Sequence, residues 1–112
     1  MRRAGALATG PVAVAAALVA LGCGHTETHR VAFQPARPPT SDVAVFVERV
    51  PERTYTEVGL VQVIAFGTEA EPPAVMAGLV REARRMGCDA IVGARLDQAG
   101  GMTHAIGVCA IW

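Results

Sequence analysis

The clearest pattern in this chain is a stretch of apolar residues with helical spacing. It begins after two prolines, and its apolar positions recur at intervals of four, four and three residues: Val75, Leu79, Ala83 and Met86. This is the period of one face of an α-helix. Proline suits the first turn of a helix, and Gly87 can adopt the left-handed conformation that ends one. The pattern predicts one amphipathic helix that begins at Pro72 and ends before Gly87.

The opposite face of the predicted helix is charged, with Arg81, Glu82, Arg84 and Arg85. Two of these arginines lie in the last turn, where cations complement the helix dipole. A charged helix face is usually solvated, but the arginines could also bind an anionic partner. Arg81, Arg84 and Arg85 are therefore a candidate partner patch.

Stretches rich in β-branched residues surround this helix and predict strands. They cover residues 43–47 and 55–66 before the helix, and residues 90–96 and 104–112 after it. Gly59 indicates a bulge or a close backbone approach within the second stretch, which could be covered on both faces. Residues 97–103 read as a hairpin loop. The order β-β-α-β-β predicts an α+β fold, in which one helix packs on a face of a small antiparallel-rich sheet.

Residues 1–22 have the features of an export signal. A short basic start with Arg2 and Arg3 precedes a mostly apolar segment that is too short and too interrupted to span a membrane comfortably. The segment ends in Val19-Ala20-Leu21-Gly22-Cys23, which resembles the lipobox of bacterial lipoproteins. That resemblance implies cleavage before Cys23 and acylation of its thiol. The alternative is an ordinary signal peptide that is cut nearby and leaves Cys23 free or disulfide-bonded.

Cleavage before Cys23 would remove two of the ten arginines, so the mature chain would carry eight basic and ten acidic side chains. Such a chain has no electrostatic attraction to anionic lipid. Membrane attachment would come from acyl chains such as palmitate, at about 0.8 kcal/mol per buried CH₂. Gly24 rather than Asp follows the cysteine, and by the same resemblance this favours the outer membrane, with the domain facing the periplasm.

Residues 23–42 are predicted to be an acylated N-terminus followed by an extended tether, and residues 43–112 to be the folded domain. Prolines are concentrated between Gln34 and Ser41, and no hydrophobic period is sustained before them. His25 and His29 flank Glu27 with a spacing that could hold a metal ion on a helix. Nothing predicts a helix there, so these side chains are interpreted as solvated linker.

Composition and motifs argue against several classes of function. The chain has no lysine, no basic run in its body and few aromatic residues, which excludes a typical nucleic-acid surface. Cys88, Asp89 and His104 could suggest a nucleophile, but a neighbouring carboxylate disfavours the thiolate. Cys88, His104 and Cys109 lack a fourth metal ligand. We therefore expect no enzyme, no cofactor and no metal site.

Acylation of Cys23 would leave Cys88 and Cys109 as an even pair in an oxidising compartment. If Leu96 lies opposite His104 in a hairpin, Cys109 lies opposite Ile91, three residues from Cys88. A disulfide between them would close a loop of about 20 residues and contribute about 3 kcal/mol. The alternative is two buried free thiols that pack as small apolar side chains. The sequence leaves both alternatives open.

Three segments resemble the YbjQ-type and RcsF-like families. They are Tyr55-x-Glu57-Val58-Gly59-x-Val61, the helix-to-strand run from Leu79 to Val92, and Ala105-Ile106-Gly107-Val108-Cys109-Ala110. The resemblance implies a small β-rich domain, and some relatives carry a heavy-metal-binding label.

The lipid anchor and the missing catalytic motifs favour an envelope protein that binds a partner or senses stress. The alternative is a lipoprotein that binds a small ligand or a heavy metal. So small a core would also gain from contacts in a homo-oligomer.

The first prediction is that Cys23 carries the lipid. Cells grown with a fatty-acid probe should label the wild-type protein, and Cys23→Ala should abolish the label and move the protein out of the membrane fraction. Equal labelling of the two proteins would show that the lipobox interpretation is wrong.

Overall fold

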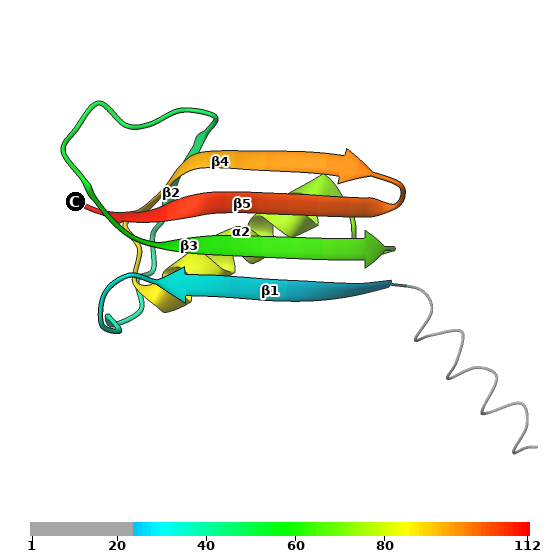
Figure 1. Cartoon of the computed structure of the whole chain (residues 1–112), viewed down its shortest axis with the longest axis horizontal. Coiled ribbons are helices and arrows are strands. Elements are labelled where there is room, and N and C mark those ends of the chain that lie inside the picture. Colours follow the sequence, from blue (N-terminus) through cyan, green and yellow to red (C-terminus); the bar gives the residue numbers. More distant parts are fainter. Residues whose placement is uncertain (1–23) are drawn as a thin grey trace, which may run out of the picture.

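The computed structural model describes residues 24–112, so the signal segment and Cys23 lie outside the described residues. The described chain forms one helix and five strands (Figure 1). In chain order these are β1 (Gly24–Ala32), β2 (Ala44–Val47), β3 (Thr56–Gly67), α2 (Pro72–Met86), β4 (Ala90–Ala99) and β5 (Met102–Ile111). The predicted α+β class is confirmed, with an additional strand at the N-terminal end. No helix within residues 24–112 is long and apolar enough to cross a membrane.

The five strands form a single sheet in the order β1-β3-β5-β4-β2. The pairs β1–β3, β3–β5 and β5–β4 are antiparallel, and β2 adds to β4 in parallel. The sheet is therefore mixed, with antiparallel pairing in its centre and a short parallel strand at one edge.

Helix α2 covers one face of this sheet, as Figure 1 shows. Its apolar positions Val75, Leu79 and Ala83 are buried, and Met86 packs against the same core. They meet the alternate residues of the central strands that point toward the helix: Val61, Val63, Ala65, Ala105 and Cys109. The helix ends at Gly87, whose φ of 80° is left-handed and whose amide donates to the Arg84 carbonyl. The predicted helix, its buried face and its glycine stop are all confirmed.

The other face of the sheet is only partly covered. At one end a second small cluster buries Ala90, Val92 and Ala110, and Phe46, Tyr55 and Val108 pack against it. Toward β1, the side chains of Leu60, Ile64 and Ile106 remain half-buried. The expectation that residues 55–66 are covered on both faces thus holds only in part.

The first correction concerns residues 24–32, which were predicted to be part of the tether. They form β1, an edge strand that pairs with β3 from Gly24 opposite Gly67 to Ala32 opposite Gly59. Its side chains are mostly polar and are exposed on both faces, so the apolar alternation that marks a buried strand is missing. The folded domain therefore includes residues 24–32 and does not start at Val43.

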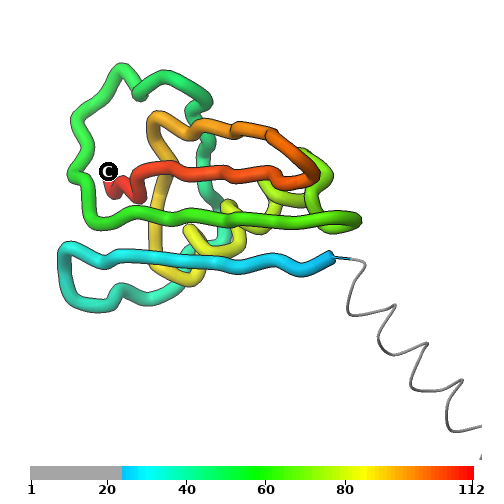
Figure 2. Tube along the Cα trace, turned by 45° about the vertical axis from the view of Figure 1, so that its right-hand side comes forward, coloured from blue at the N-terminus to red at the C-terminus, as the bar shows by residue number. Residues whose placement is uncertain are grey.

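The second correction concerns the proline-rich segment that follows β1. Figure 2 shows it running from the end of β1, past the C-terminal end of α2, to β2 at the opposite edge of the sheet. Thr40 fixes it there, because its amide donates to the Arg84 carbonyl at 3.0 Å and its hydroxyl donates to the Cys88 carbonyl at 2.6 Å. The segment is a strap across the end of the helix and not a free spacer.

Cys88 and Cys109 form a disulfide, with 5.4 Å between their Cα atoms. Both residues are fully buried. The bond joins the turn after α2 to the far end of β5, across a sequence separation of 21 residues. Of the two alternatives that the sequence left open, the structure has the bridge.

The β4–β5 register is predicted correctly at one end only. Cys109 lies opposite Ile91, as expected, but His104 lies opposite Asp97 rather than Leu96. The register shifts by one between Val92 and Arg95, where Gly93 has a φ of 61°. This bulge inserts a residue into β4. Both strands also continue further than predicted, so that a turn at Gly100-Gly101 replaces the longer loop.

Candidate functional site

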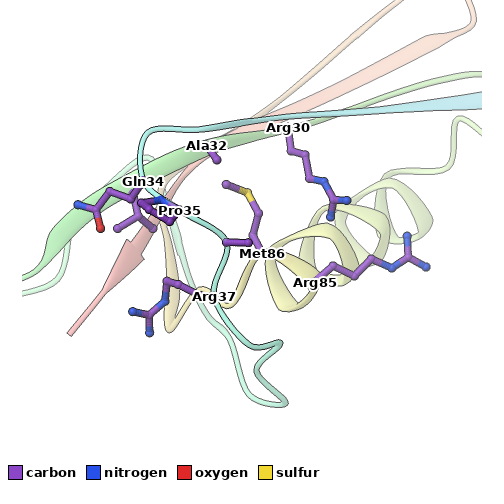
Figure 3. A pocket seen from close by; sticks show the side chains of 9 residues that line it. Arg30, Ala32, Gln34, Pro35, Arg37, Arg85 and Met86 are labelled. Atoms are coloured by element: carbon purple, nitrogen blue, oxygen red, sulfur yellow. The ribbon is translucent and has the colours of Figure 1, made fainter.

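The best-formed pocket of the described chain lies where the end of β1, the strap and the end of α2 meet (Figure 3). Its volume is about 300 Å³. The residues that line it are Arg30, Ala32, Gln34, Pro35, Ala36, Arg37, Val58, Arg85 and Met86. We call it the arginine pocket, because three arginines surround a mainly apolar floor.

The floor depends on a close approach of Met86 to β3. The Met86 methyl group lies where a β-carbon on Gly59 would be, and the Val31 carbonyl approaches the same point. Any side chain at residue 59 would therefore displace Met86 or β1. The strand also has a register shift between Glu57 and Gly59. Both features that the sequence suggested for Gly59, a bulge and a close approach, are present.

Glu82 organises the arginines on one side of the pocket. Its carboxylate lies 2.8 Å from an Arg85 guanidinium nitrogen and 3.7 Å from one of Arg30. Only 8% of the Glu82 side chain is exposed, whereas more than half of each arginine side chain is exposed. Burial of a carboxylate is costly unless cations and hydrogen bonds compensate it, which these two arginines do.

The position of Glu82 corrects the prediction that it lies on a solvated helix face. Glu82 lies seven residues after Val75 and three after Leu79, and this spacing places it on the buried side of α2, where Arg30 of β1 contacts it. The helical spacing alone therefore indicates the burial of Glu82, whereas its pairing with Arg30 could not be predicted without β1.

Arg37 lies on the opposite side of the pocket and belongs to the strap. Its Nε donates a hydrogen bond of 3.2 Å to the Gly87 carbonyl at the end of the helix. A β-carbon on Gly87 would collide with the Pro38 carbonyl and the Arg37 side chain, so glycine here permits both the helix stop and the close strap. A neutral carbonyl leaves the guanidinium charge uncompensated. Three arginines and one buried carboxylate therefore give this region an excess of positive charge.

The arginines predicted as a partner patch are all exposed. Of the three, only Arg85 lines the pocket, while Arg81 and Arg84 lie on the adjacent solvent side of α2. Sequence reasoning missed Arg30 and Arg37, which were assigned to the tether. The one signal that could have revealed β1 is the presence of three β-branched residues, Thr26, Thr28 and Val31, a weak indication of a strand.

The cysteine and histidine arrangements considered as catalytic or metal sites do not form. Cys88 and Cys109 are joined to each other. His104 lies on the opposite face of the sheet from Cys109, where its Nε2 is 2.8 Å from the Gln62 side-chain nitrogen. The carboxylate of Asp89 accepts the backbone N–H of Trp112. These side chains are thus held apart by structural contacts.

His25, Glu27 and His29 lie on one face of β1, because alternate residues of a strand share a face. The carboxylate of Glu27 lies 3.4 Å from the His25 ring nitrogen and 3.9 Å from that of His29. A metal site with this spacing would require a helix, and these residues form a strand instead. Within residues 24–112 no three His, Cys, Asp or Glu side chains are grouped closely enough to hold a metal ion.

Comparison of the chain with protein-family models, with curated proteins and with solved structures gave no match. The arginine pocket is therefore interpreted from its own geometry.

The second prediction concerns the buried carboxylate. Glu82→Gln should lower the free energy of unfolding by about 1–2 kcal/mol, because it removes the charge-assisted hydrogen bond from Arg85 and the ion pair with Arg30, and both arginines can then turn toward solvent. Urea denaturation of the purified protein would measure the change. Glu57→Gln is the matched control, since Glu57 is exposed and should change stability by less than about 0.5 kcal/mol. Equal losses in the two variants would contradict the assigned ion pairs.

Proposed function

We propose that this protein is a lipid-anchored protein of the bacterial envelope, held through Cys23, that binds an acidic segment of a partner protein in the arginine pocket. It acts without catalysis, as a binding or stress-sensing module. The resemblance to the YbjQ-type and RcsF-like families belongs to the same proposal.

The observation that carries the proposal is the composition of the pocket. Arg30, Arg37 and Arg85 line the pocket together with Val58 and Met86, and Figure 3 shows the guanidinium groups of Arg37 and Arg85 at its outer sides. Arginine forms bidentate hydrogen bonds with carboxylates, and the apolar floor suits an aliphatic side chain. A volume of about 300 Å³ is at the lower limit for a small-molecule site and fits one or two side chains. An acidic segment with one apolar residue matches both features.

The disulfide supports an envelope location, because such bonds persist in oxidising compartments. Since β1 begins at Gly24, directly after the proposed lipid attachment, the domain would sit at the membrane rather than on a long tether. The pocket lies about six residues further along β1, roughly 20 Å from that point. The proposed partner is therefore an envelope protein close to the same membrane, and the outer membrane facing the periplasm remains the favoured location.

A small anionic ligand with an apolar tail is a second candidate, because the same charges and the same floor would bind it. A heavy metal has less support, since the thiols that prefer such ions are bonded to each other. The two remaining candidates differ in what should bind to the purified protein.

The third prediction tests the pocket with a defined probe. A short glutamate-rich peptide with a single leucine should bind the purified protein, as measured by fluorescence anisotropy. Arg37→Gln/Arg85→Gln should bind it about tenfold more weakly, because exposed charge pairs contribute up to about 1 kcal/mol each. Arg95→Gln is the control, since Arg95 is exposed on β4 and does not line the pocket.

A photo-crosslinking residue in place of Gln34 should then capture one protein in intact cells, and the double arginine variant should lose that adduct. The same residue in place of Gln98, near the β4–β5 turn, should not capture it. If decanoate binds but the peptide does not, the small-ligand candidate replaces the partner protein. If Arg37→Gln/Arg85→Gln and the control Arg95→Gln bind the peptide equally well, the arginine pocket is not the binding site.

A further inference from the structure

One edge of the sheet is open for pairing with another strand. β1 ends the strand order, and Figure 1 shows no element beyond it on its outer side. It is nine residues long and pairs with β3 without a register shift. The opposite edge strand, β2, has only four residues and an irregular register. A long, regular edge without proline or lysine lacks the usual protection against pairing with another chain.

The hydrogen bonds of β3 establish which backbone groups of β1 face outward. The Phe33 amide donates to the Val58 carbonyl, and the Gly67 amide donates to the Gly101 carbonyl. In an antiparallel ladder, residues alternate between facing one neighbour and facing the other. The odd-numbered residues of β1 therefore bond to β3. The outward N–H and C=O groups belong to the even-numbered residues: Gly24, Thr26, Thr28, Arg30 and Ala32.

We propose that β1 pairs in antiparallel fashion with β1 of a second copy of this chain, about a two-fold axis at Thr28. The two five-stranded sheets then form one continuous sheet of ten strands. In this register Thr28 faces Thr28, Glu27 faces His29, and Thr26 faces Arg30. The proposal rests on the backbone edge of β1, and Arg30 and Ala32 are the residues of the seam that also line the arginine pocket.

Charge complementarity selects this register. Glu27 and His29 lie in the closely spaced pairs that are not hydrogen-bonded, where facing Cα atoms are about 4.5 Å apart. Each Glu27 then meets the His29 of the other copy, and this contact occurs twice. A shift in one direction places the two Glu27 carboxylates opposite each other, and a shift in the other direction pairs the two His29 rings. Two carboxylates directly opposite each other destabilise a strand pair, and two facing His29 rings lose their carboxylate partners.

The helix-side face of the proposed seam is also complementary. Thr26 already donates a hydrogen bond of 2.7 Å to Glu69. Arg30 of the second copy would face Thr26 and thus approach this carboxylate. Thr28 would face Thr28 of the second copy, and the two hydroxyl groups of such a pair can hydrogen-bond to each other. Because both faces of the seam match when β1 meets itself, a second copy fits this edge better than a strand of unspecified sequence.

Disulfide trapping in the full chain tests the register. Thr28→Cys should form a cross-linked dimer under mild oxidation in isolated membranes, because facing Cα atoms lie about 5.5 Å apart in a hydrogen-bonded pair, within disulfide range. Thr26→Cys is the matched control, since the two copies of residue 26 would be four residues, or about 14 Å, apart along the seam. The wild-type protein shows how much cross-linked dimer forms through Cys23 alone. A monomeric Thr28→Cys protein, equal trapping at residue 26, or an adduct with a different protein would overturn the proposal.

A charge exchange in the Thr28→Cys protein provides the second test. Glu27→His alone should reduce the trapped dimer at least fivefold, because histidine would then face histidine. Glu27→His/His29→Glu restores the opposite pair and should recover the dimer. Both residues are exposed, and unchanged circular dichroism would confirm that the monomer fold is intact. Full trapping of the single variant, or no recovery in the double variant, would contradict the self-pairing register.

Discussion

The structure depends on the packing of one face of α2 against the two central strands. Val75, Leu79 and Ala83 bury the middle of the sheet, and the disulfide from Cys88 to Cys109 holds the end of the helix to β5. The strap and β1, which lie at the margin of the sheet, are positioned relative to this core. The strap crosses the helix end because Gly87 leaves room for it, and β1 is aligned by its ladder to β3.

The arginine pocket results from this arrangement and not from any single element. β1 supplies Arg30, the strap supplies Arg37, and α2 supplies Arg85. Glu82 lies between the helix and β1, where its buried charge is compensated by the arginines on either side. The N-terminal segment of the domain thus forms one wall of the pocket and also provides the open edge of the sheet.

Sequence reasoning recovered the parts of the fold whose residues bury apolar surface. The period of α2, its glycine stop and the β-branched strands all reflect burial, and burial leaves a pattern. β1 leaves almost none, because an edge strand of histidine, threonine and glutamate is exposed on both faces and is held by backbone hydrogen bonds. The pairing of Glu82 with Arg30 and the path of the strap depend on β1, so they could not be predicted without it. The register error beyond Gly93 has a different cause, since a bulge depends on local backbone conformation that no periodicity records.

Hydrogen exchange at individual amides tests most directly whether residues 24–42 belong to the folded domain. The amides of Phe33 and Thr40 donate to Val58 and Arg84, respectively, and should exchange as slowly as amides at the centre of the sheet. Exchange as fast as in an unfolded chain at both positions would show that this segment is a free tether. The pocket and the open edge would then lose their basis.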